Sequence, residues 1–99
     1  MSYSVRFRKR AAKEYLETIA WYKQRSLQAA ENFVLNVQVT LNTIEKQPEH
    51  FRKTYKHFYE AKTKKYPFCI VYFIDEVKQY IVVTTLFHQK RNPKNKFKR

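Results

Sequence analysis

A histidine near the C-terminus stands among residues that could carry out phosphodiester chemistry. His88 is followed closely by Lys90 and Arg91. An imidazole can act as general base or acid in phosphodiester cleavage, while neighbouring cations stabilise the charge that develops on the phosphate. Taken alone, however, the pattern favours an exposed histidine at the end of a strand, with no catalytic role.

The other residues of reactive type give weaker signals. His50 and His57 are seven positions apart and have no HxxxH spacing or cysteine partner, so we expect no metal site. Cys69 is the single cysteine and lies in an apolar run, which predicts a small buried hydrophobe rather than a nucleophile or a disulfide partner. The chain contains no glycine, which excludes Gly-rich phosphate loops and dinucleotide fingerprints. We therefore predict no cofactor.

Charge is the strongest compositional signal. The 99 residues include 21 Lys plus Arg and 8 Asp plus Glu, giving a formal net charge of +13. Thirteen of the cations, but only three acids, follow residue 49. Such an imbalance indicates a polyanionic partner, which could be nucleic acid, an acidic protein or an anionic membrane surface. Aromatic residues that could stack on bases are interleaved with these cations: Phe51, Tyr55, Phe58, Tyr59, Tyr66 and Phe97. A solvated basic face with inward-pointing aromatics explains the pattern about equally well.

The first half of the chain must supply helices. Alternation of Tyr3, Val5 and Phe7 with polar residues predicts a short strand. From about Lys9, apolar residues follow a helical period: Ala12, Tyr15, Leu16, Ile19 and Tyr22. Ser26 can cap a second helix that Pro48 ends, and its apolar stripe is Ala30, Phe33, Val34, Val37, Leu41 and Ile44. The short joint at about 23–26 favours an antiparallel helical hairpin.

The second half reads as strands. A short strand is expected at about 58–62, a central one at 68–75 and a β-branched one at 80–87, with a turn at 75–78. The predicted fold is α+β: an N-terminal strand, a helical hairpin, then a mostly antiparallel sheet in the order β-α-α-β-β-β, with the helices on one face and the other face open. Residues 1–99 would form one domain that ends in a basic tail at about 90–99.

No apolar run is long enough to span a membrane, and the N-terminus lacks the apolar core of a signal peptide. A soluble cytoplasmic protein is the expectation.

These segments together resemble toxins of the RelE/ParE superfamily of type II toxin–antitoxin systems. The resemblance covers nearly the whole chain and rests on element order, spacing and basic charge. It includes helical residues Ala12, Leu16 and Tyr22, the Pro48–Phe51–Arg52 stretch, YPFCIVYFID (66–75) and FHQKRNP (87–93). It implies a small cytoplasmic toxin that arrests growth, is linked to plasmid stabilisation, and is wrapped and neutralised by a cognate antitoxin. Antitoxin segments of the family dock in grooves beside the helices, and basic charge would suit an acidic segment.

The resemblance leaves two targets open. RelE-like members cut messenger RNA on the ribosome, whereas ParE-like members poison DNA gyrase and are not ribonucleases. The five positions that carry RelE-type chemistry fall at Glu60, Lys62, Cys69, Arg91 and Phe97, and only Lys62 and Arg91 keep that chemistry. Other ribonucleases of the superfamily use a histidine near the end of the last strand, where His88 lies. We therefore favour the ParE-like mode, with RelE-like cleavage as the alternative and a non-toxic nucleic-acid-binding module as a third hypothesis.

Each mode assigns residues. If the chain is a ribonuclease, its catalytic residues are expected to be His88, Arg91, Lys62 and Lys65. In either mode, contacts with the target or with nucleic acid are expected from Arg52, Lys64, Lys90, Lys94, Lys96, Phe97, Lys98 and Arg99. The expected partners are an antitoxin with an acidic segment and either gyrase or the ribosome with its mRNA; a homodimer is compatible with the sequence, and no membrane partner is expected.

Overall fold

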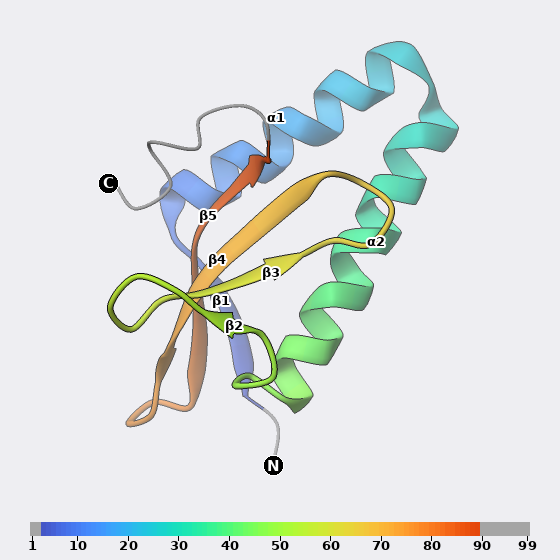
Figure 1. Ribbon diagram of the computed structural model, residues 1–99. Helices are drawn as coiled ribbons and strands as arrows, with labels where there is room; N and C mark the ends of the chain where they lie inside the picture. Colours follow the sequence, from blue (N-terminus) through green and yellow to red (C-terminus); the bar gives the residue numbers. More distant parts are fainter. Residues whose placement is uncertain (1–2, 90–99) are drawn as a thin grey trace.

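The computed structural model describes residues 3–89, and within them the element order agrees with the sequence prediction. One short strand, a helical hairpin and a run of strands follow one another, as Figure 1 shows. The elements are β1 (Ser4–Phe7), α1 (Lys9–Arg25), α2 (Leu27–Lys46), β2 (Arg52–Lys53), β3 (Tyr59–Lys62), β4 (Phe68–Asp75) and β5 (Tyr80–His88). The predicted α+β class is confirmed. The predicted tail at 90–99 lies outside the described residues.

The strands form one five-stranded sheet in the order β1-β5-β4-β3-β2. Among the described strands, β1 alone pairs in parallel, with β5; the other neighbours are antiparallel, so the mostly antiparallel sheet is confirmed. β4 is central, and its first five residues are buried, as expected of a strand that is apolar on both faces. A register shift between Val71 and Tyr72 in the β4–β5 pair marks a bulge.

Ser26 alone joins the two helices, which spread as a V in Figure 1. Its backbone N–H donates to the Tyr22 carbonyl and ends α1, while its hydroxyl accepts from the Ala29 N–H at 3.2 Å and starts α2. The predicted cap is therefore confirmed. α1 runs further than expected, to Arg25, because basic residues are favourable in a last helical turn.

The helices bury their apolar stripes on one face of the sheet. The α2 residues Phe33, Val37 and Ile44 are fully buried there against Ile70 and Tyr72. The predicted stripe of α1 is wrong at Leu16, which is 64% exposed. Ala11, at 0% exposure, takes part in the core instead, together with Tyr15, Ile19 and Tyr22. Spacings of four, four and three residues keep this set on one helical face, and Leu16 is rotated about 100° away from Tyr15.

The remaining differences lie on the sheet. Arg52 and Lys53 form a two-residue strand that the sequence did not predict, paired with Glu60 and Tyr59. β5 extends one residue further than expected, to His88, and the turn before it occupies residues 76–79. Without glycine in the chain, Gln79 takes the positive φ of 59° that closes this turn.

The face of the sheet away from the helices is less open than expected. Cys69, Val71 and Phe87 form a second apolar cluster there, with Phe58 packed against it. The prediction that Cys69 is a small buried hydrophobe is confirmed, since the residue is 4% exposed and its thiol is free.

Candidate functional site

The residues predicted for RNA cleavage lie in two separate hollows. His88 lines a hollow between α1 and the ends of β4 and β5. Lys62 and Lys65 line another, between α2 and the segment that follows β3. Arg91 lies outside the described residues. The described part of the chain therefore does not place His88 in the lysine hollow.

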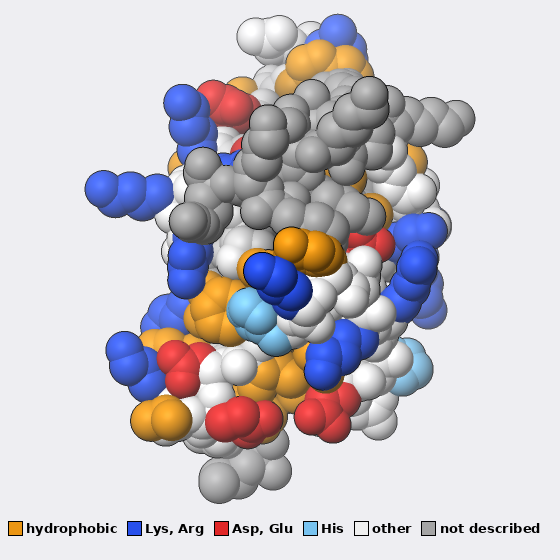
Figure 2. All heavy atoms as spheres, turned by 60° about the vertical axis from the view of Figure 1, so that its left-hand side comes forward, with side chains coloured by type: hydrophobic (Ala, Val, Ile, Leu, Met, Phe, Trp, Pro, Cys, Tyr) orange, Lys and Arg blue, Asp and Glu red, His pale blue; other side chains and the backbone are white. Residues whose placement is uncertain are grey.

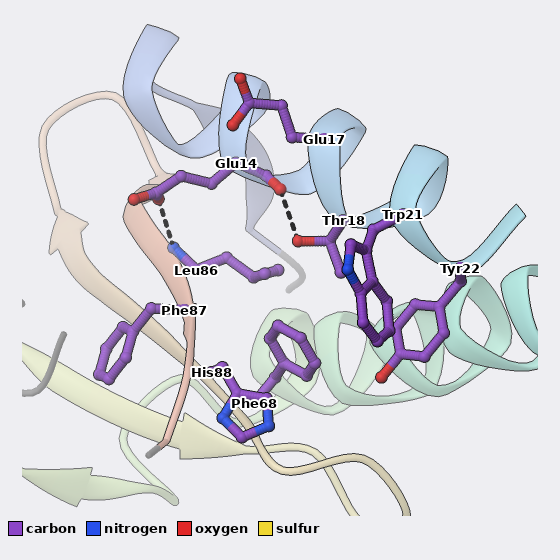
Figure 3. Close-up of a pocket in the computed structure, with 9 residues that line it drawn as sticks. All are labelled: Glu14, Glu17, Thr18, Trp21, Tyr22, Phe68, Leu86, Phe87 and His88. Carbon is purple, nitrogen blue, oxygen red and sulfur yellow. Dashed lines mark hydrogen bonds between the residues drawn. The ribbon is translucent and has the colours of Figure 1, made fainter. Parts of the chain in front are cut away.

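The hollow at His88 is walled by carboxylates and aromatic rings. Its volume is about 310 Å³, and Figure 3 shows α1 side chains on one side and sheet side chains on the other. The His88 ring contacts the Phe68 ring edge-on, with centroids 5.3 Å apart. Trp21, 39% exposed, packs edge-on against Tyr22 and carries the Arg25 guanidinium 3.6 Å from its ring centroid. The lining residues are Glu14, Glu17, Thr18, Trp21, Tyr22, Phe68, Leu86, Phe87 and His88.

Glu14, in this hollow, has a structural task. β1 pairs with β5 as far as Val83, and within residues 3–89 no strand pairs with the next part of that β5 edge. The Glu14 carboxylate replaces the strand: one oxygen accepts from the Leu86 backbone N–H at 2.9 Å and from the Thr85 hydroxyl at 2.7 Å (Figure 3 draws the first). The other oxygen pairs with Arg10 at 3.2 Å. The contacts with Leu86 and Thr85 hold α1 on the sheet, and the contact with Arg10 lies within α1, so Glu14 is already engaged and is not a free base.

A group of cations and aromatic rings lies on the sheet face away from the helices. Arg6 and Phe73 both pair with Val82 across the sheet and so share that face. The Arg8 guanidinium lies 5.4 Å from the Phe73 ring centroid. The ring centroids of His57 and Phe73 are 5.3 Å apart, so His57 also belongs to this group. Arg6 lies 4.3 Å from the ring centroid of Tyr80. We call Arg6, Arg8, His57, Phe73 and Tyr80 the cation–aromatic face.

The sequence prediction missed this face because it assigned the basic surface to the second half of the chain. Arg6 and Arg8 come from β1 and the residue after it, and they reach Phe73 and Tyr80 only because β1 pairs with β5. The signal was present in the alternation, since Arg6 and Arg8 occupy the positions opposite the inward-facing Val5 and Phe7. Figure 2 shows Lys and Arg side chains spread over one side of the molecule, with hydrophobic side chains exposed among them.

Two positions at which the RelE pattern carries cations are buried here. Cys69 is 4% exposed and Glu60 is 7% exposed. Neither side chain is a cation, and neither has the exposure needed to clamp a phosphate from solvent. Arg52 and Lys64, two of the predicted contact residues, are exposed. The other predicted contact residues lie outside the described residues: Lys90, Lys94, Lys96, Phe97, Lys98 and Arg99.

Tyr72 is a titratable group that burial perturbs strongly. Burial raises the pKa of its phenol, and the neighbouring Tyr59 adds to the rise. The neutral hydroxyl donates to the Pro48 carbonyl at 2.6 Å and so ties the end of α2 to β4. This tyrosine is a structural donor. Within residues 3–89, no group of three or more His, Cys, Asp or Glu side chains is arranged to hold a metal, and no helix is long and apolar enough to cross a membrane.

Comparison with protein families decides the relationship. Residues 5–93 match the family described as the ParE toxin of the type II toxin–antitoxin system parDE. The chain belongs to the ParE toxin family. The superfamily resemblance seen in the sequence is thereby confirmed, and the chain is a type II toxin by family. No curated protein matches this ParE-family chain.

Solved structures confirm the fold of this ParE-family toxin. The chromosomal ParDE system from P. aeruginosa matches with a TM-score of 0.71 at 11% identity, covering 88% of this chain and 96% of that one. The isolated E. coli RelE toxin matches with a TM-score of 0.63 at 18% identity, covering 93% and 89%. The toxin–antitoxin complex RelBE of E. coli gives 0.63 at 19%, covering 91% and 100%. Both ParE and RelE structures share the fold, so the fold alone leaves the target open.

Proposed function

We propose that this toxin arrests growth by acting on DNA gyrase, and that a cognate antitoxin neutralises it. One observation carries the choice of target. Cys69, at the position where the RelE pattern has an arginine, is a buried thiol in the second apolar cluster. A phosphorane-like transition state needs exposed cations around it, and a buried neutral side chain supplies none.

The surroundings of His88 favour the same choice. A cleavage site would need a base beside the attacking hydroxyl and cations around the phosphate. The described residues that line the hollow with His88 include two carboxylates, Glu14 and Glu17, and no lysine or arginine. Carboxylates beside a phosphate would oppose binding of the substrate.

The cation–aromatic face is the surface that we assign to the target. Guanidinium groups that lie over rings are held in place without an acidic partner, so they remain available for a protein or nucleoprotein surface. Arg8 and His57 both contact Phe73, so these three side chains form one connected part of this face. This assignment requires no catalytic dyad, in agreement with a toxin that traps its target rather than cutting RNA.

The antitoxin is expected to bring an acidic segment. The formal net charge of +13 favours association with a polyanionic partner and speeds the encounter. Solved relatives of this fold include complexes described as RelBE toxin–antitoxin complexes from E. coli and M. tuberculosis. Cytoplasmic location, a role in plasmid stabilisation and a homodimer stay predictions.

Induction in bacterial cells tests the target. We expect growth arrest with gyrase-linked DNA breaks and with no new transcript 5′ ends inside translated codons. His88→Ala should remain fully toxic. New 5′ ends that disappear in His88→Ala would instead establish ribosome-dependent cleavage. Absence of growth arrest, together with steeply salt-dependent binding to bare DNA or RNA, would favour the non-toxic nucleic-acid-binding module.

A matched pair of variants tests the surface. Arg8→Ala removes a guanidinium that lies over a ring on the sheet face, and Arg25→Ala removes one that lies over Trp21 on α1. We expect Arg8→Ala to weaken inhibition of gyrase supercoiling by about tenfold, as for an arginine that is an energetic hot spot of an interface. Arg25→Ala should change it less than about threefold. Equal effects of both would remove the assignment of the cation–aromatic face.

A further inference from the structure

The hollow that contains the predicted lysines has the character of a ligand site. It lies between α2 and the segment that follows β3 and has a volume of about 290 Å³. Part of its lining comes from α2, and the rest comes from the lysine-bearing segment and the residues that precede β2. Its lining residues are Asn36, Val39, Thr40, Thr43, His50, Phe51, Lys62, Lys64 and Lys65.

The lysine-bearing segment is anchored at several points. The backbone N–H of Lys65 donates to the Asn36 side-chain oxygen at 3.0 Å, which ties the segment to α2. The Thr63 side chain is 5% exposed, and its hydroxyl bonds the Tyr66 and Phe68 carbonyls. The Tyr66 hydroxyl reaches the Ala29 carbonyl at 3.4 Å. The backbone that carries the lysines is therefore fixed before any ligand arrives, which lowers the entropic cost of binding.

The charge of this hollow is uncompensated. None of its nine lining residues is acidic, and no ion pair joins Lys62, Lys64 or Lys65 to an acid within residues 3–89. Three ammonium groups carried by four consecutive residues repel one another, and only an anion would relieve that repulsion. Two of the lining side chains differ in character, because Val39 and Phe51 are apolar.

We propose that this hollow binds the phosphate groups of a nucleoside polyphosphate. Lys62, Lys64 and Lys65 would neutralise the phosphates, since lysine binds phosphate as a point charge. A di- or triphosphate concentrates several negative charges on one short group, which suits three lysines that line one hollow. A peptide would have to bring three separate carboxylates to the same point. The base and ribose would lie against the rings of Phe51 and His50, which contact each other with centroids 5.0 Å apart.

Calorimetric titration of the full-length chain tests the proposal. The probes are ATP, AMP, inorganic triphosphate, a short single-stranded DNA and a Glu-rich peptide. One variant carries Lys62→Gln, Lys64→Gln and Lys65→Gln. Its control carries Lys9→Gln, Lys13→Gln and Lys23→Gln, three exposed lysines of α1, so both variants have a formal charge of +10 (13 minus 3). Circular dichroism melts confirm that both are folded.

We expect ATP to bind more tightly than AMP and than inorganic triphosphate. The Lys62/Lys64/Lys65 variant should lose about tenfold in affinity, because each exposed ionic contact is worth a factor of about two. The α1 control should lose less than about threefold. Amide shifts of residues 62–65 on adding ATP would support the site. Equal losses in both variants, equal binding of triphosphate and ATP, or tighter binding of the DNA or the acidic peptide would overturn it. None of these readouts depends on toxicity or on the target of the toxin.

Discussion

Replacing Glu14 should weaken the attachment of α1 to β5 and so destabilise the fold. Its carboxylate accepts two hydrogen bonds from the part of β5 that follows the end of its pairing with β1. The donors are the Leu86 backbone N–H at 2.9 Å and the Thr85 hydroxyl at 2.7 Å. Thr85 and Leu86 are each 1% exposed with the Glu14 carboxylate in place, so both donors are shielded from water in the folded chain. Glu14→Ala therefore leaves two buried donors, the Leu86 N–H and the Thr85 hydroxyl, without their hydrogen-bond acceptor.

The expected loss follows from these contacts. Each buried donor left without a partner costs about 1–3 kcal/mol, so two give about 2–6 kcal/mol. The Glu14 side chain is 25% exposed, so we expect the lower half of this range, about 3 kcal/mol. Loss of the partly exposed Arg10–Glu14 ion pair, at 3.2 Å, adds at most about 0.5 kcal/mol to the loss of stability. In a domain of this size, a loss of about 3 kcal/mol lowers the melting temperature by roughly 15 °C. Glu14→Gln keeps an oxygen acceptor and should cost only about 1 kcal/mol.

Urea unfolding followed by tryptophan fluorescence measures these differences, since Trp21 lies two turns along the same helix. Glu17→Ala is the matched control: Glu17 is on the same helix, lines the same hollow and is exposed. It should change the free energy of unfolding by less than about 0.5 kcal/mol. If Glu14→Ala is as stable as Glu17→Ala, the carboxylate does not replace the missing strand and the argument fails.

Two further changes test the joints of the fold. Ser26→Ala should cost about 1 kcal/mol of unfolding free energy, because the hydroxyl caps α2 at Ala29, whereas Ser4→Ala on an exposed strand position should be nearly neutral; denaturant melts compare the two. Burial raises the pKa of Tyr72, so its phenol stays neutral in the folded chain while the unfolded one ionises above about pH 10. The stability that the neutral phenol provides is complete below about pH 10 and is lost as the pH rises further. Tyr72→Phe should therefore cost about 1 kcal/mol of unfolding free energy at neutral pH. In melts at increasing pH, the stability of this variant should fall less steeply above about pH 10 than that of the parent.

Local pattern was enough for most elements. The period change near Lys9 gave α1, and the apolar run at 68–75 gave β4 with its observed bounds. Ser26 marked the helix joint because a capping hydroxyl is a local interaction between residues three apart. The prediction that Leu16 is buried was wrong because the sequence of α1 allows two overlapping apolar stripes. Only contact with the sheet selects the stripe that contains Ala11.

The functional surfaces depended on contacts that no local pattern contains. The parallel pairing of β1 with β5 brings Arg6 and Arg8 to Tyr80 and Phe73, more than sixty positions later in the chain. The anchoring of Lys65 to Asn36 likewise joins segments 29 positions apart and creates the lysine hollow.

The sequence by itself therefore determined the class of the fold, the order of its elements and the excess of positive charge, because periodicity and composition are properties of neighbouring residues. Only the tertiary structure decided which cations share a surface. It placed His88 in a hollow that Glu14 and Glu17 also line, and gathered Lys62, Lys64 and Lys65 in another hollow. The physical reason is that sheet register and helix docking fix these distances, and both are set by the burial of side chains far apart in the chain.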